Sequence, residues 1–102
     1  MKIIKQKLLT VVTERAIEDL ILKDMKRLGA KGYSLVESRG EDHRGLRHAE
    51  WEANRDVRIE VLCEEAIARS IVEHLSKTYY DDYDMTIFMS DVDVFVRKEK
   101  PI

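Results

Sequence analysis

The sequence lacks several residues and patterns that would place it in a specialised class of protein. It has 102 residues, with one cysteine, one proline and four glycines. A single cysteine excludes a disulfide framework within the chain and favours a reducing, cytoplasmic location. No apolar run approaches the roughly 18 residues of a membrane-spanning helix, so no direct insertion into a membrane is expected. With 18 basic against 20 acidic residues, the chain also lacks the basic excess of a general nucleic-acid binder.

Core-type residues are scarce in one long central stretch, residues 39–58. This stretch holds five arginines and five acidic residues, and it separates two strand-like segments. A connection of this length is unusual in a compact domain and is typically functional or disordered. We therefore expect a single domain, residues 1–102, that carries a long flexible loop at 39–58.

Periodic spacing of apolar residues predicts four strands and two helices. Alternation predicts strands at 7–13, 33–38, 57–63 and 86–96, with a turn at 80–85 before the last one. A first helix is expected after an N-cap at Thr13 and to stop at Gly29 and Gly32, with Ala16, Ile17, Leu20, Ile21, Met25 and Leu28 at helical spacing. A second helix should end near Tyr79 and carry inward Ala66, Ile67, Ile71, Val72 and Leu75. The order βαββαβ predicts an α+β, ferredoxin-like sandwich with both helices on one face of a four-stranded antiparallel sheet.

The other face of the predicted sheet is neither fully polar nor fully apolar. The first strand is largely apolar on both sides, and the third places Arg58, Glu60 and Leu62 away from the core. Such a face is typical of burial against another subunit, so we expect a homo-oligomer. Cys63 ends the apolar run of the third strand and is expected to be a small buried hydrophobe.

Three segments resemble PII-like signalling proteins: residues 29–34 (GAKGYS), 58–63 (RIEVLC) and 77–88 (KTYYDDYDMTIF). The last is most similar to the inorganic-carbon branch, whose members are associated with bicarbonate transporters and carboxysomes. The resemblance implies a homotrimer with nucleotide sites in the clefts between subunits. It also implies that residues 39–58 are the T-loop, which touches the target protein, that 80–85 corresponds to the nucleotide-contacting B-loop, and that the tail 97–102 supplies charged phosphate contacts.

The resemblance implies roles for individual residues. The nucleotide-binding set is Ser34, Gly40, Glu60, Leu62, Tyr83, Asp84, Thr86, Phe88, Arg97 and Lys98. Arg97 is the best phosphate ligand because arginine binds phosphate bidentately. In the loop, convergent donors for a small anion such as bicarbonate are His43, Arg44, Arg47 and His48, and Trp51 is a candidate anchor for a partner. For Arg97 and Lys98 the alternative is a solvated charged tail, and for Glu60 and Leu62 it is plain packing in an interface. For the loop residues the alternative is a salt-bridged loop.

Two departures from nitrogen-type PII proteins bear on ligand and control. The turn 80–85 is acidic and lacks the glycine and lysine that cradle a triphosphate, so ADP, AMP or cyclic AMP should be preferred over ATP. Trp51 occupies the position of the modified tyrosine, which argues against control by uridylylation. His43 and His48 lack the ligand company of a metal site, and none is expected.

The function expected from this resemblance is regulation. The chain would bind an adenine nucleotide, with bicarbonate as a candidate second ligand, and act on a partner such as a bicarbonate transporter. One alternative is a trimeric interaction module that docks constitutively and has no physiological nucleotide. No nucleophile–base constellation is evident, so an enzyme is not expected, and slow conversion of a ligand near Asp81, Asp82 or Asp84 is the third reading.

Overall fold

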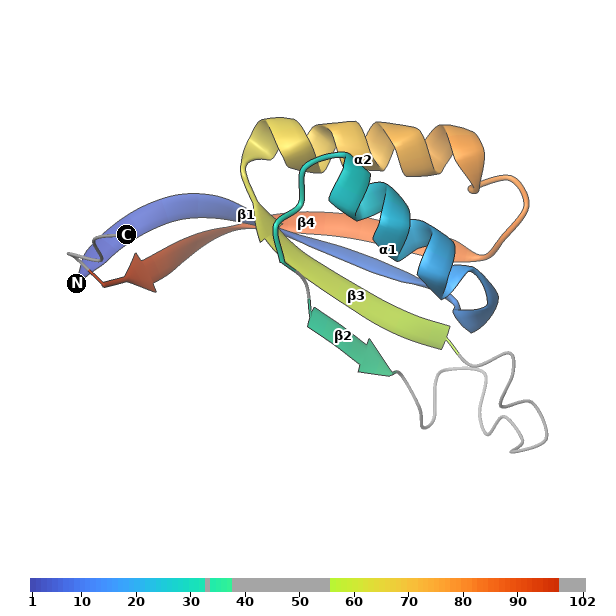
Figure 1. The fold of residues 1–102 in the computed structure, drawn as a ribbon, viewed down its shortest axis with the longest axis horizontal. Coiled ribbons are helices and arrows are strands. Elements are labelled where there is room, and N and C mark those ends of the chain that lie inside the picture. Colours follow the sequence, from blue (N-terminus) through green and yellow to red (C-terminus); the bar gives the residue numbers. More distant parts are fainter. Residues whose placement is uncertain (33, 38–55, 98–102) are drawn as a thin grey trace.

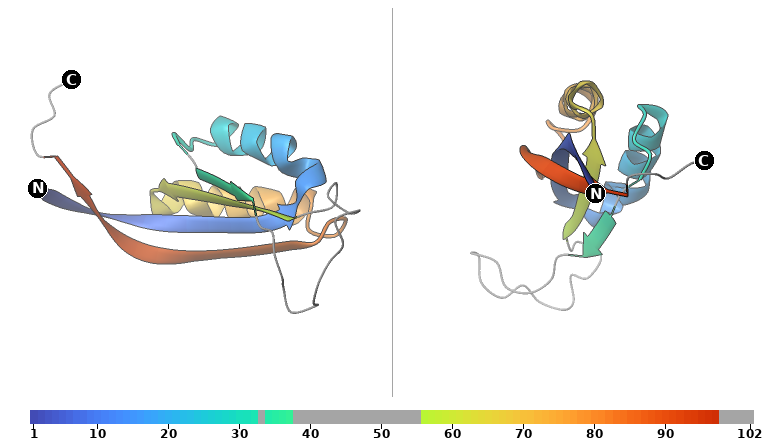
Figure 2. Two further views of the ribbon diagram at one scale, coloured as in Figure 1. Left: turned by 90° about the horizontal axis from the view of Figure 1, so that it is seen from below. Right: turned by 90° about the vertical axis from the view of Figure 1, so that its left-hand side faces the viewer.

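The computed structural model of the chain describes residues 1–32, 34–37 and 56–97 (Figure 1). Its elements in chain order are β1 (Lys2–Glu14), a 3₁₀ turn (Arg15–Ile17), α1 (Glu18–Arg27), β2 (Ser34–Glu37), β3 (Asp56–Cys63), α2 (Glu65–Thr78) and β4 (Met85–Val96). The four strands form one sheet in the order β2-β3-β1-β4, and all the pairings are antiparallel. Both helices cover the same face (Figure 2). The ferredoxin-like prediction is therefore confirmed.

The core lies between the two helices and the sheet. On β3 every second side chain is buried, from Val57 to Cys63, as the alternating sequence predicts. The helices add Ile21 and Met25 from α1 and Ile71 from α2, each 0 % exposed. Full burial of such a side chain stabilises a fold by about 1.5–3 kcal/mol. The burial of Cys63, at 6 % exposure, confirms its expected structural role.

The start of the first helix differs from the prediction. Thr13 is not an N-cap, because β1 continues through Glu14 and α1 begins only at Glu18. The Thr13 hydroxyl donates instead to the backbone carbonyl of Asp84 at 2.8 Å, a partner 71 residues away. Leu20, although at helical spacing, lies on the outer side of α1 and is 50 % exposed.

Two smaller corrections concern the second helix and the loop boundary. Ala66 is exposed, and Ala68 takes the inward position that α2 offers. The loop predicted at 39–58 ends earlier, because β3 begins at Asp56, and pairing with β1 holds the last three of its residues in the sheet. Its other members, and the end of the second predicted strand at Ser38, lie outside the described residues.

Gly29 ends α1 as predicted. Its φ of +113° is a backbone conformation that side chains with a Cβ rarely adopt. The reversal lets the Ala30 N–H donate to the carbonyl of Met25 at 3.0 Å, which closes the last turn.

The first strand of the chain is longer than predicted. β1 starts at Lys2 rather than at Lys7, because residues 2–6 pair with residues 92–96 of β4. These ten residues form a two-stranded ribbon that extends past the helices and past β2 and β3 (Figure 1). We refer to them below as the ribbon.

Candidate functional site

The sheet face opposite the helices carries one row of residues that crosses all four strands. Ser34 pairs with Glu60, Glu60 with Thr10, and Thr10 with Phe88. The neighbouring row places Arg58 opposite Val12, and Val12 opposite Thr86. The sheet thus brings four of the predicted site residues together on one face: Glu60, Leu62, Thr86 and Phe88. Ser34 lies in the same row as Glu60 and Phe88.

This face combines apolar exposure with an ion pair. Phe88 is 48 % and Leu62 45 % exposed, whereas Thr10 between their strands is only 1 % exposed. The guanidinium Nε of Arg58 donates to Oε2 of Glu60 at 3.4 Å. Large exposed apolar side chains beside charged ones are typical of a surface that another molecule covers.

The turn between α2 and β4 is held by its backbone. The N–H of Asp84 donates to Oε2 of Glu14 at 2.8 Å, while the carbonyl of Asp84 accepts from Thr13. The ring of Tyr83 meets that of Tyr79 edge to face at 6.3 Å. The side chains of Asp81, Asp82 and Asp84 remain exposed. The turn therefore presents a fixed backbone and an acidic rim.

A groove of about 350 Å³ opens between α2 and the first residues of β4. Its lining residues are Val72, Ser76, Tyr80, Ile87, Phe88 and Met89. Only Phe88 belongs to the set predicted from sequence. The others could not be found from local pattern, because the groove exists only where α2 packs beside β4.

Arg97 is remote from the predicted residues at the start of β4. It follows the last residue of β4, and Asp84 precedes the first. Twelve extended residues place the two ends of the strand roughly 40 Å apart at about 3.3 Å per residue. Lys98 and the loop candidates lie outside the described residues: Gly40, His43, Arg44, Arg47, His48 and Trp51.

A polar cluster that sequence reasoning missed joins the two helices. The Tyr79 hydroxyl donates to Oδ2 of Asp24 at 2.6 Å, and Nε2 of His74 lies 2.9 Å from the same oxygen. Burial raises the pKa of the Asp24 carboxyl, but the hydrogen bonds from Tyr79 and His74 outweigh it, so the net shift is downward. Burial and the Asp24 carboxylate together raise the pKa of Tyr79 to about 12. The cluster therefore links α1 to the end of α2 through hydrogen bonds.

Neither a metal site nor a membrane span is evident in the described parts of the chain. Among residues 1–32, 34–37 and 56–97, no three His, Cys, Asp or Glu side chains are grouped to hold a metal ion. Within the same ranges, neither helix is long and apolar enough to cross a bilayer.

The sequence and the fold both match one known family. The family model of the nitrogen regulatory protein P-II matches residues 6–100. The chain belongs to the P-II family. A PII-like signaling protein from Thermus thermophilus is 35 % identical, with 92 % of this chain and 93 % of that chain covered and a TM-score of 0.79. This P-II membership confirms the resemblance seen in residues 29–34, 58–63 and 77–88.

Solved structures of a second PII-like protein share the fold at lower identity. CPII from Thiomonas intermedia, bound to ADP, AMP and bicarbonate, is 21 % identical over 91 % of each chain, with a TM-score of 0.76. Its apo form is 19 % identical over 91 % of this chain and 95 % of that one, with a TM-score of 0.75. At this identity the likeness describes the fold.

Proposed function

We propose that this P-II family protein is a homotrimeric regulator that binds an adenine nucleotide in clefts between its copies. ADP or AMP is the preferred nucleotide, and bicarbonate is a second ligand. The T-loop, residues 39–58, then acts on a partner in inorganic-carbon uptake or fixation, such as a bicarbonate transporter. The protein binds and signals without turnover.

The positions of Asp84 and Arg97 support the part of this proposal in which each nucleotide site is shared between two copies. The two lie at opposite ends of β4, roughly 40 Å apart. A nucleotide is much shorter than this, so a site that uses both takes them from different copies. The exposed Phe88 and Leu62 on the open sheet face give a second copy a surface to cover.

Two observations support ADP or AMP as the preferred nucleotide: the acidic turn of this chain and its similarity in fold to CPII. Three exposed carboxylates, from Asp81, Asp82 and Asp84, disfavour the extra charge of a γ-phosphate. CPII, which has the same fold, is described as bound to ADP, AMP and bicarbonate. For the T-loop to signal, the ligand must bind one loop state more tightly than another.

The test is calorimetric titration of the protein with AMP, ADP, ATP and cyclic AMP, each with and without bicarbonate. We expect micromolar binding of ADP or AMP that tightens with bicarbonate. Arg97→Ala should weaken it at least about ten-fold, since charge-assisted hydrogen bonds contribute about 1.5–3 kcal/mol. Arg69→Ala removes another exposed arginine, which pairs with Glu65 on α2, and should leave affinity unchanged.

One outcome would favour the second candidate, a constitutive trimeric interaction module. If light scattering shows a trimer but none of the four nucleotides binds, the signalling proposal fails. The open apolar face around Phe88 and Leu62 supports self-association in either case. A measurable conversion of bound nucleotide would contradict both.

A further inference from the structure

The turn between α2 and β4, residues 79–84, is held at its two ends by different parts of the chain. At its start, the N–H groups of Asp82 and Tyr83 donate to the carbonyl of Tyr79, at 2.9 and 3.1 Å. At its end, Asp84 is bound through both its N–H and its carbonyl by the last two residues of β1. The start of the turn is therefore tied to its own helix, whereas its end depends on residues 70 and 71 positions earlier in the chain.

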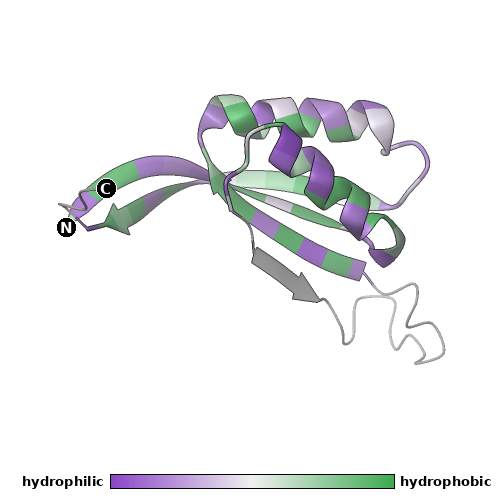
Figure 3. Cartoon of the chain, in the orientation of Figure 1, coloured by the Kyte–Doolittle hydropathy of each residue, from purple (hydrophilic) through white to green (hydrophobic). Residues whose placement is uncertain are grey.

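Few other contacts fix the end of this turn. Figure 3 shows the turn in hydrophilic colours, and of residues 80–84 only Tyr83 packs against the hydrophobic core. The turn also contains no proline, which would preset one of its backbone angles. The position of Asp84 therefore depends mainly on its two hydrogen bonds to β1.

Thr13 and Glu14 reach Asp84 from the two sides of the sheet. Thr13 is on the helix-covered side, is 1 % exposed, and donates from Oγ1 to the Asp84 carbonyl at 2.8 Å. The backbone of Glu14 is still extended, so strand alternation turns its side chain towards the open face, where Oε2 accepts from the Asp84 N–H at 2.8 Å. Thr86 lies on the same open face, opposite Val12. Glu14 thus fixes a peptide group at the edge of the surface that carries the predicted nucleotide residues.

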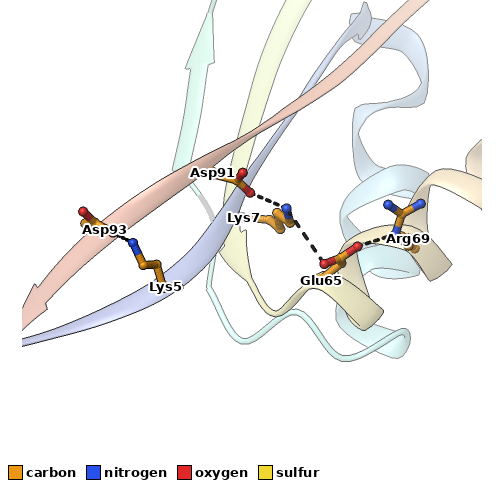
Figure 4. Close-up of polar contacts among 6 residues, drawn as sticks. All are labelled: Lys5, Lys7, Glu65, Arg69, Asp91 and Asp93. Carbon is orange, nitrogen blue, oxygen red and sulfur yellow. Dashed lines mark hydrogen bonds and ion pairs between the residues drawn. The ribbon is translucent and has the colours of Figure 1, made fainter.

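Farther along, the same pair of strands is joined in a different way. At the ribbon and its base, side-chain ion pairs link β1 to β4, Lys5 with Asp93 and Lys7 with Asp91 (Figure 4). The side chains of Lys5 and Asp93 are 83 % and 50 % exposed, and exposed ion pairs of this kind contribute little stability. At the turn, by contrast, a side chain binds a backbone amide. A contact of this second kind sets where the backbone itself points.

We propose that Glu14, together with Thr13, is a positioning residue for nucleotide binding. It holds the turn in the conformation in which Tyr83, Asp84 and Thr86 meet the ligand, and it acts through Asp84 without touching the nucleotide. The inference rests on the proposed function, in which these three residues contact an adenine nucleotide. If the turn takes the binding conformation for only a fraction of the time, the apparent affinity falls by that fraction. Holding the turn in advance therefore raises the affinity without adding a contact to the ligand.

Glu14 has two opposing effects on a nucleotide in this position. Its carboxylate adds a negative charge near Asp81, Asp82 and Asp84, which by itself disfavours phosphate groups. Its hydrogen bond favours binding, because it fixes the turn. Glutamine separates the two effects, since its side-chain carbonyl still accepts from the Asp84 N–H but carries no charge. Loss of the acceptor and loss of the charge should therefore change the affinity in opposite directions.

Amide hydrogen exchange of the nucleotide-free protein, followed by NMR, tests whether Glu14 holds the turn. In Glu14→Ala, the Asp84 amide should exchange at least about ten-fold faster than in the wild type, because it loses its charged acceptor. Glu14→Gln should retain the slow exchange. The control, Glu73→Ala, removes an exposed glutamate that pairs with Lys77 on α2, and should leave the Asp84 amide unchanged. Equal exchange rates in Glu14→Ala and the wild type would overturn the proposal.

Calorimetry with ADP and AMP tests the consequence for binding. We expect about three- to ten-fold weaker binding to Glu14→Ala, and equal or tighter binding to Glu14→Gln. Glu73→Ala should bind as the wild type does. Thermal unfolding checks that each variant is folded during the titration; a residue that only stabilised the fold would lower the melting temperature and leave the affinity unchanged. Tighter binding to both Glu14 variants would show that Glu14 acts by its charge alone, and would also overturn the proposal.

A second variant removes the other hydrogen bond to the same residue. Thr13→Val keeps the shape of the buried side chain and deletes the hydroxyl that donates to the Asp84 carbonyl. It should weaken ADP binding in the same direction as Glu14→Ala. The two losses should not be additive in the double variant, because both substitutions act through Asp84. Full additivity would contradict this shared route.

The outcomes separate this inference from the proposed function. If ADP binds the wild type and Glu14→Ala equally well, only the role of Glu14 is wrong. If the wild type binds none of the four nucleotides, the proposed function fails, and this role fails with it. If Glu14→Ala both frees the Asp84 amide and weakens binding, while Glu14→Gln does neither, the positioning role and the proposed ligand are both supported.

Discussion

The hydroxyl of Tyr79 donates a 2.6 Å hydrogen bond to the carboxylate of Asp24, and so joins the end of α2 to the middle of α1. Tyr79 is 8 % exposed and is part of the hydrophobic core. The bond adds a polar contact to the apolar packing between the two helices. Three predictions about stability follow from this contact and from the end of α1, and one concerns ligand choice.

Tyr79→Phe should lower the free energy of unfolding by about 1–2 kcal/mol, since a hydrogen bond to a charged group is lost while the ring packing stays. Urea unfolding followed by circular dichroism measures the change. Tyr80→Phe removes an exposed hydroxyl one residue away and should change the free energy by less than about 0.5 kcal/mol. Equal effects of the two substitutions would show that the Asp24 contact contributes no stability.

The raised pKa of Tyr79 makes stability depend on pH at the alkaline end. Its pKa is about 12 in the folded chain, against a reference of 10.0. Because the folded pKa is the higher one, this contribution is fully present below pH 10 and is lost as the pH rises towards 12. Absorbance titration of the tyrosines should show one group ionising near pH 12 that is missing from Tyr79→Phe. Identical curves for the two proteins would contradict the shift.

Gly29→Ala should destabilise the fold by about 1–3 kcal/mol, because a residue with a Cβ is strained at φ +113°. The added Cβ would also lie 3.3 Å from Cδ1 of Ile67. Gly32→Ala is the matched control, since nothing lies within 4 Å of the position its Cβ would take. Thermal unfolding of both variants compares them, and a Gly32→Ala protein as unstable as Gly29→Ala would exclude this explanation.

Neutralising the acidic rim should alter the preference between nucleotides. In the double variant Asp81→Asn with Asp82→Asn, we expect the affinity for ATP to rise relative to ADP by about two- to five-fold, since exposed charges are strongly screened. Calorimetry at low and high salt measures both ligands. Lys77 and Glu73 form an exposed ion pair on α2, and Glu73→Gln provides a control of the same charge change per residue. An unchanged ratio would mean that the rim lies away from the γ-phosphate.

Local sequence pattern was sufficient where a single element decided the outcome. The strict alternation of Val57, Ile59 and Val61 predicted both the strand and its buried face. Gly29 and Gly32 were predicted to stop the first helix, and the structure shows a positive φ at Gly29 directly after it. The family resemblance rested on short segments, and the match over residues 6–100 confirms it.

Features that depend on distant partners were missed. The first strand was predicted to begin only at Lys7, and residues 2–6 extend it because β4 pairs with them 86 to 94 residues later along the chain. Thr13 has the chemistry of an N-cap, but its hydroxyl is used by Asp84. The Asp24–Tyr79 bond spans 55 residues and has no local signature. The roles of the site residues themselves remain predictions.

The length of β4 also has a consequence for complementation between mutant alleles. With Asp84 at one end and Arg97 at the other, each chain of the proposed assembly holds two halves of different sites. Two alleles, one defective at the turn and one at Arg97, would each be inactive alone. In a cell that expresses both, mixed assemblies would contain some interfaces at which neither half is damaged. Such alleles should therefore complement one another, because β4 is too long to bring its own two ends to one site.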